Sequence, residues 1–144
     1  MLLNVLGELV WQEWFLSGEI RREIRHDSFV VMPNHVHGVV IIDRALNVGA
    51  HGHAPLHGSL DKSAPAPKGS LGSFVIGFKS SSTQRINSLR DSLGEPVWQR
   101  NYYERIIRDT KELNQIRKYI FKNPENWDED PENTVHLPWR HSLF

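Results

Sequence analysis

Apolar positions along the chain switch between helical and strand spacing and predict a helix followed by a β-hairpin. Residues 2–20 carry apolar side chains every three or four positions, which is typical of one buried helix face. Two β-branched, apolar runs follow at residues 24–32 and 35–43. Pro33 and Asn34 stand between them, and this pair predicts the turn of a hairpin.

Helical spacing returns twice, and a third strand is expected between the two segments. Residues 70–89 repeat apolar side chains at helical intervals behind a serine, a residue type that caps helix starts. Residues 97–107 are aromatic and β-branched, and part of this segment is predicted to form a strand. Asp109 and Glu112 have the spacing of a capping box that opens a last helix, which a proline closes.

This order of elements predicts an α+β fold, an antiparallel sheet with helices packed on it. At 144 residues the chain is expected to form one domain. It has no cysteine, which excludes disulfides, a thiol nucleophile and a cysteine-based zinc site. No apolar run approaches the roughly 18 residues of a membrane span, and the first ten residues lack the positive charge of a signal peptide. A cytoplasmic protein is therefore expected.

The segment between the hairpin and the second helix has a different composition. Residues 47–69 are rich in glycine and proline and are predicted to form a flexible loop. A loop of this length in a small domain is expected to be disordered or functional. It contains His51, His53 and His57, which could bind a metal ion, although a polar insert is the simpler interpretation.

Charge is unevenly distributed along a chain whose formal net charge is zero. Residues 74–123 hold ten Lys or Arg and five Asp or Glu, a net of +5, whereas residues 124–144 hold five acids and one base, a net of −4. Local charge steers a polyanion more than the sum does. The basic segment therefore suits a nucleic-acid partner, and an ordinary solvated helix face is the alternative.

His35 and His37 are candidate metal ligands. They stand two residues apart in an apolar run, and in a strand such residues face the same side. Imidazole nitrogen binds manganese, zinc or iron, and a catalytic ion needs a third protein ligand. The alternative is a pair of histidines at the edge of the core that only form hydrogen bonds.

Tyr119 and Asn123 are further candidates, because residues four apart lie on one face of a helix. A tyrosine hydroxyl can act as a nucleophile, and an amide oxygen can bind a metal ion; packing is the alternative role for the tyrosine. Tyr102 and Tyr103 are rival nucleophiles. Their segment mixes aromatic rings with arginines, which is typical of a platform for single-stranded nucleic acid and also of an ordinary strand.

Four motifs in this order resemble the single-tyrosine HUH transposases, and most closely the REP-associated tyrosine transposases of bacteria. The motifs are MPNHVH at 32–37, SLGSF at 70–74, VWQRNYY at 97–103 and YIFKNP at 119–124. The resemblance runs from about residue 5 to residue 127. It implies a ferredoxin-like antiparallel sheet that here lacks the family's usual first strand. It also implies a catalytic domain at residues 1–127, followed by an acidic tail at 128–144.

The resemblance implies a metal-dependent DNA-cleaving and strand-transferring enzyme. His35, His37 and Asn123 would bind divalent magnesium or manganese, and Tyr119 would attack single-stranded or hairpin DNA to give a 5′-phosphotyrosine intermediate. The enzyme would act as a monomer or homodimer. Two alternatives stay open: a catalytically inactive module that binds DNA hairpins, and a small metal-binding protein that uses the three loop histidines. The residues expected to contact phosphates are Arg100, Arg105, Lys118 and Lys122.

Overall fold

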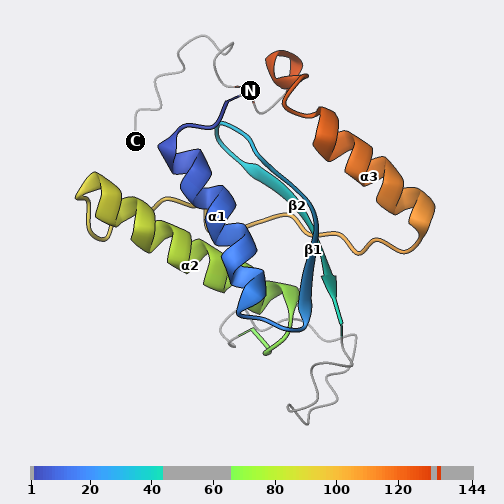
Figure 1. Ribbon diagram of the computed structural model, residues 1–144, viewed down its shortest axis with the longest axis horizontal. Coiled ribbons are helices and arrows are strands. Elements are labelled where there is room, and N and C mark those ends of the chain that lie inside the picture. The colour runs from blue at the N-terminus through green and yellow to red at the C-terminus, as the bar shows by residue number, and fades with distance from the viewer. Residues whose placement is uncertain (1, 44–65, 131–132, 134–144) are drawn as a thin grey trace.

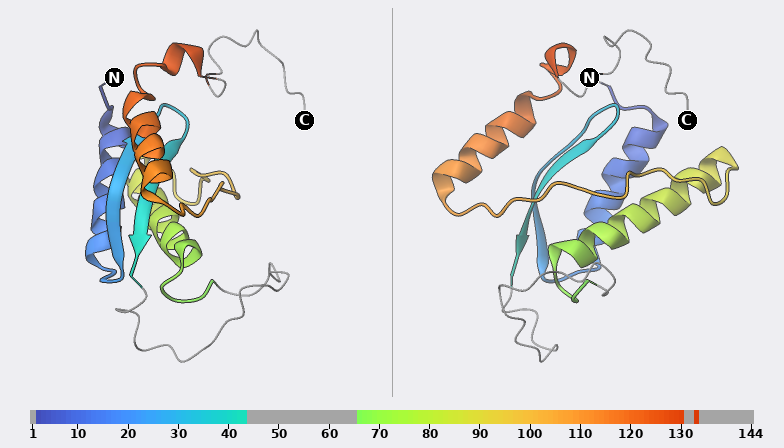
Figure 2. Two further views of the ribbon diagram at one scale, coloured as in Figure 1. Left: turned by 90° about the vertical axis from the view of Figure 1, so that its right-hand side faces the viewer. Right: turned by 180° about the vertical axis from the view of Figure 1, so that it is seen from behind.

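The computed structural model describes residues 2–43, 66–130 and 133. The hairpin lies between α1 and α2 on one side and α3 on the other (Figure 1), and Figure 2 shows the same arrangement from behind. The predicted α+β fold, with helices packed on an antiparallel sheet, is confirmed. In chain order the elements are α1 (Val5–Glu19), β1 (Ile24–Val31), β2 (Val36–Ile42), α2 (Leu71–Arg90), α3 (Thr110–Lys122) and the 3₁₀ turn η2 (Trp127–Glu129).

The register of the hairpin decides which face each histidine occupies. β1 and β2 pair antiparallel, with Phe29 opposite Gly38 and Val30 opposite His37, and they make up the sheet as far as the described residues go. Gly38 lies against α1 so closely that a Cβ there would stand 2.5 Å from Cζ2 of Trp14. Since neighbouring residues of a strand face opposite sides, His37 points away from Trp14, toward the α3 side.

The core between the hairpin, α1 and α2 is built around Trp14. Its ring stacks on Phe29 with centroids 4.3 Å apart, and the rings of Phe74 and Phe78 meet it edge-on at 5.0 and 5.3 Å. All four side chains come from positions with the predicted helical or strand spacing. Aromatic pairs in these geometries add about 0.5–1.5 kcal/mol each beyond their buried area, so this cluster fixes both helices against the sheet.

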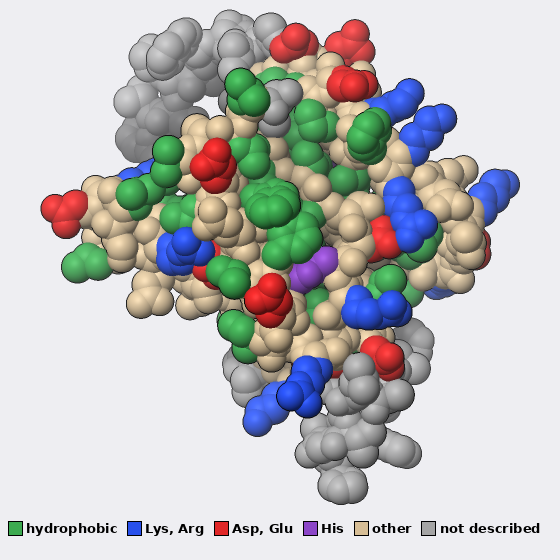
Figure 3. All heavy atoms as spheres, in the orientation of Figure 1, with side chains coloured by type: hydrophobic (Ala, Val, Ile, Leu, Met, Phe, Trp, Pro, Cys, Tyr) green, Lys and Arg blue, Asp and Glu red, His purple; other side chains and the backbone are tan. Residues whose placement is uncertain are grey.

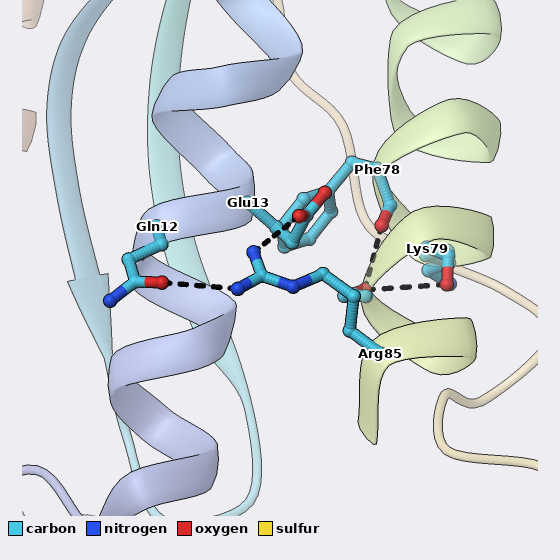
Figure 4. A network of polar contacts seen from close by, with 6 residues as sticks. Gln12, Glu13, Phe78, Lys79 and Arg85 are labelled. Atoms are coloured by element: carbon cyan, nitrogen blue, oxygen red, sulfur yellow. Dashed lines mark hydrogen bonds and ion pairs between the residues drawn. The ribbon is translucent and has the colours of Figure 1, made fainter. Parts of the chain in front are cut away.

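A polar contact also joins α1 to α2, as Figure 4 shows. Arg85 of α2 donates from Nη1 to Oε1 of Glu13 at 2.6 Å and from Nη2 to Oε1 of Gln12 at 3.2 Å. Glu13 is only 7% exposed, and a buried carboxylate is costly without a cationic partner. The ion pair therefore explains how a glutamate can occupy the buried face of α1.

The strand predicted within residues 97–107 is wrong, because this segment is irregular. Its backbone carbonyls bind a side chain of α2 instead of a neighbouring strand: Lys79 donates from Nζ to the oxygens of Gln99 and Asn101 at 2.7 and 3.2 Å. Trp98 packs on Phe78 and donates from Nε1 to Oγ of Ser82 at 2.9 Å. The aromatic content of the segment reflects packing on α2.

The predicted helix starts hold for α2 and α3. Ser70 accepts from the amide of Ser73, and Asp109 accepts from the amide of Glu112. The first helix, however, begins at Val5 behind an Asn4 cap.

None of the helices in the described ranges has the length and apolar character needed to cross a membrane. Most of the predicted loop, its three histidines and most of the acidic tail lie outside the described residues.

Candidate active site

The two histidines converge on one point. His35 lies just before β2 and His37 lies in it, and their Nε2 atoms are 3.0 Å apart. This agrees with the expectation that both rings leave the sheet on one side. Nδ1 of His35 lies 2.7 Å from Oδ1 of Asn34. In the tautomer that carries its proton on Nδ1, His35 donates to that oxygen and directs the lone pair of Nε2 toward His37.

Helix α3 brings Tyr119 to this pair. The rings of Tyr119 and His37 meet edge-on with centroids 5.3 Å apart, and Tyr119 remains 57% exposed. The helix is held against β1 by Arg117, whose Nε donates to Oδ1 of Asp27 at 2.8 Å. A tyrosine that is both exposed and packed on an imidazole is accessible to a large substrate at the histidine pair.

Asn123 ends α3 one turn beyond Tyr119. Its side chain is 4% exposed, and its Nδ2 is buried without a hydrogen-bond partner among the described residues. A buried polar atom without a partner costs about 1–3 kcal/mol. An orphan amide one helical turn beyond Tyr119 is available to complete its contacts with a ligand.

The electrostatics favour neutral His37. Its pKa is lowered from 6.5, first by burial and then by the positive charge that His35 can carry, while the carboxylate of Asp130 opposes the shift. A neutral imidazole is the form that binds a metal ion. Asp27 has a lowered pKa because Arg117 donates to it, so the contact that holds α3 persists at neutral pH.

The donor atoms fit a divalent metal ion. Two nitrogens each about 2.1 Å from one ion and at right angles around it stand about 3 Å apart, which matches the 3.0 Å between the two Nε2 atoms. In the described part of the chain, no group of three or more His, Cys, Asp or Glu side chains is placed to hold a metal. Among these described residues the candidate for a third ligand is therefore of another type: the amide of Asn123, which can turn its oxygen to the place of the orphan nitrogen.

The site also includes a residue that the sequence did not single out. Trp127, the first residue of η2, places its ring centroid 6.0 Å from that of His35. The sequence assigned this position only to the end of the domain. The available signal was its spacing, since Trp127 follows Asn123 by one helical turn.

The residues predicted to contact phosphates do not form one cluster. Lys118 and Lys122 are exposed on α3, and Lys and Arg side chains line that side of the molecule in Figure 3. Arg100 lines a hollow between α2 and residues 93–100. Arg105 forms an ion pair with Glu112, so part of its charge is already neutralised.

The rival tyrosines lie elsewhere. The ring of Tyr102 sits beneath the ammonium group of Lys79, 5.6 Å from its centroid, and Tyr103 is 88% exposed. Neither has a described ring contact with the histidine pair, whereas Tyr119 does. This geometry favours Tyr119 over both as the residue that works with His35 and His37.

Comparison with known proteins places the chain in a family. No protein-family model matches it, and no solved structure matches it. An "Uncharacterized protein" of Haemophilus influenzae is 39% identical over 133 residues, which are 90% of this chain and 71% of that protein. Identity at this level over most of both chains means a shared fold. The chain therefore belongs to the same family as this Haemophilus influenzae protein.

Proposed function

We propose that the protein cleaves and rejoins single-stranded DNA, with Tyr119 as the nucleophile and His35, His37 and Asn123 as ligands of a divalent metal ion. One observation carries the proposal. Tyr119, from α3, packs on His37, whose Nε2 lies 3.0 Å from Nε2 of His35. A candidate nucleophile and a pair of converging nitrogens thus meet although they are far apart in the sequence.

The proposed reaction exchanges one phosphoester bond for another. The oxygen of Tyr119 forms a bond to a backbone phosphorus, and the bond from that phosphorus to the 3′ oxygen breaks. The tyrosine loses its proton and the departing 3′ oxygen gains one, which leaves a 5′-phosphotyrosine link and a free 3′ hydroxyl. The reverse attack by a 3′ hydroxyl rejoins the strand, so no external energy source is needed. A bound divalent ion supplies polarisation of the phosphate oxygens.

The surface around Tyr119 suits a polyanionic strand. Lys118 and Lys122 flank it on α3 and are exposed. Ammonium groups attract backbone phosphates without regard to sequence. Tyr119 itself is 57% exposed, so a strand can reach its hydroxyl without displacing the helix.

Covalent capture tests the proposal. Single-stranded hairpin DNA with manganese should give wild-type protein a DNA adduct that resists denaturation, and Tyr119→Phe should give none. Tyr102→Phe and Tyr103→Phe are matched controls that should keep the adduct. A chelator should abolish the adduct, and added manganese should restore it.

Two results contradict the proposed enzyme. One is an adduct that survives in Tyr119→Phe, and the other is a folded wild-type protein that forms none. If that wild-type protein still binds hairpins, with affinity that falls as salt rises, the inactive hairpin-binding module becomes the better account.

A further inference from the structure

Four rings form a continuous row across the site. Tyr119 meets His37 at 5.3 Å, His37 meets His35 at 4.7 Å, and His35 meets Trp127 at 6.0 Å between centroids. The row begins on α3, crosses the start of β2 and ends on η2. Trp127 is partly exposed, so its ring is not consumed by the core.

The turn that carries Trp127 is fixed in place. The carbonyl of Trp127 accepts from the amide of Asp130 at 3.1 Å and from Nδ2 of Asn133 at 2.9 Å. Asn133 is 6% exposed. The hydrogen bond from the buried side-chain amide of Asn133 to the main-chain carbonyl of Trp127 limits the movement of the backbone there. The backbone that carries the ring is therefore held in position before any ligand arrives.

The two ends of the row of rings have neighbouring charges of opposite sign. At the Tyr119 end, Lys118 and Lys122 attract phosphates. At the other end, the exposed carboxylates of Asp128 and Glu129 adjoin Trp127 and repel them. A nucleotide in the site therefore gains most by directing its phosphate toward Tyr119 and its uncharged base toward Trp127.

We propose that Trp127 is a base-stacking residue, which binds the nucleobase of a nucleotide next to the phosphate that Tyr119 attacks. The inference rests on the proposed function and adds a contact that positions the strand. Every base has a flat π face, so stacking on an aromatic ring tolerates any sequence. Loss of one such contact is expected to weaken binding about ten-fold, within the range measured for single-stranded DNA on aromatic platforms.

The test measures binding apart from cleavage, using full-length protein with Tyr119→Phe and a chelator present. Oligonucleotides carry one abasic position, moved along the strand. In the background protein, one abasic position should weaken binding about ten-fold. Adding Trp127→Ala should weaken binding to the intact strand by a similar factor and remove the sensitivity to that position. Trp127→Phe should restore both. Trp11→Ala, which removes another exposed tryptophan, should change neither.

Several outcomes overturn the inference. They are abasic sensitivity that persists in Trp127→Ala, failure of Trp127→Phe to restore binding, and absence of any position-dependent effect. Circular dichroism confirms that each variant is folded. Covalent capture in protein that retains Tyr119 reports separately on the proposed reaction. Adduct formation with no role for Trp127 contradicts only the stacking inference. Stacking with no adduct contradicts the proposed reaction, and with it the placement of the base next to an attacked phosphate, while the base contact itself stands.

Discussion

His26 is surrounded by aromatic rings, and its burial favours the uncharged form of the imidazole. Its ring lies 5.4, 5.2 and 5.8 Å from those of Trp14, Phe15 and Phe74, and its Nε2 is buried without a partner among the described residues. Burial lowers its pKa from 6.5, although a hydrogen bond to the backbone of Trp14 opposes the shift. The folded state therefore resists the proton that the unfolded chain accepts.

This difference predicts a loss of stability in mild acid. Above pH 6.5 His26 is neutral in both the folded and the unfolded chain, and it does not reduce the free energy of unfolding. As the pH falls through 6.5 toward the lowered pKa, the unfolded chain binds a proton that the folded chain does not. The free energy of unfolding then drops by up to about 1.4 kcal/mol per pH unit. Urea titrations at pH 7.5 and 5.5 measure the drop.

The variant His26→Gln keeps a donor for the Trp14 carbonyl and does not titrate. Between pH 7.5 and 5.5 the free energy of unfolding should fall less in this variant than in the wild type. Part of the drop should remain, since the pKa of His37 is also lowered. An unchanged pH dependence would show that His26 is not the group responsible.

Single residues differed in how far the sequence could predict them. Strand periodicity was enough to place His35 and His37 on one side. Helical spacing put Asn123 one turn from Tyr119. No local pattern shows that α3 crosses to the histidine pair, because that depends on the Arg117–Asp27 contact between distant segments. Trp127 was missed because its spacing from Asn123 is a weak signal and its contact with His35 joins segments that are distant in the sequence.

Within α1, two glycines lead to opposite expectations for the same substitution. A Cβ on Gly18 would overlap the His26 ring, which its aromatic neighbours hold in place. A Cβ on Gly7 would meet Cδ2 of Leu3 at 3.2 Å, the end of a flexible side chain. Gly18→Ala should lower the free energy of unfolding by about 1–3 kcal/mol, and Gly7→Ala should raise it by up to about 1 kcal/mol. Urea titration compares the two, and equal effects would contradict the close approach at Gly18.

The position of α3 depends on Arg117. Replacing it with glutamine should loosen the helix while the rest of the fold stays intact. Exposed ion pairs contribute less than about 1 kcal/mol, so amide hydrogen exchange in α3 should rise by up to about five-fold. Lys111→Gln removes one positive charge from the same helix and serves as the control. Equal exchange in both variants would show that Asp27 does not anchor α3.

Elements were predicted well where periodicity reflects burial, and less well where it does not. Both strands of the hairpin, α1 and α2 have apolar faces that meet the core, and α3 buries Ile120 of its apolar stripe. Residues 97–107 share the residue types of a strand, yet Lys79 binds two of their carbonyls and Trp98 turns its ring onto α2. Strand propensity measures fit to a packed surface rather than pairing itself, so composition alone could not separate the two cases.

At the scale of the whole molecule, zero net charge hides a basic side. Lys and Arg side chains gather along α3 in Figure 3, while the acidic residues of η2 stand at its end. In the proposed function, binding of a single strand would release the counterions that its phosphates had condensed. The affinity of such a surface therefore falls with rising salt, according to the number of phosphates that it contacts. The affinity for a single strand should depend on where the charges lie on the surface and not on the net charge of the protein.

The salt dependence of the proposed DNA binding tests whether this distribution matters. Lys118→Ala and Lys122→Ala should each reduce the slope of log affinity against log salt concentration by about 0.7 for a single strand. Arg22→Ala removes the same charge from an exposed position in the turn between α1 and β1, and it should leave the slope unchanged. Fluorescence anisotropy of a labelled oligonucleotide from 50 to 300 mM salt measures all three variants. An Arg22 variant whose slope falls as much as those of the lysine variants would mean that binding follows net charge. The α3 side would then not be where the strand lies.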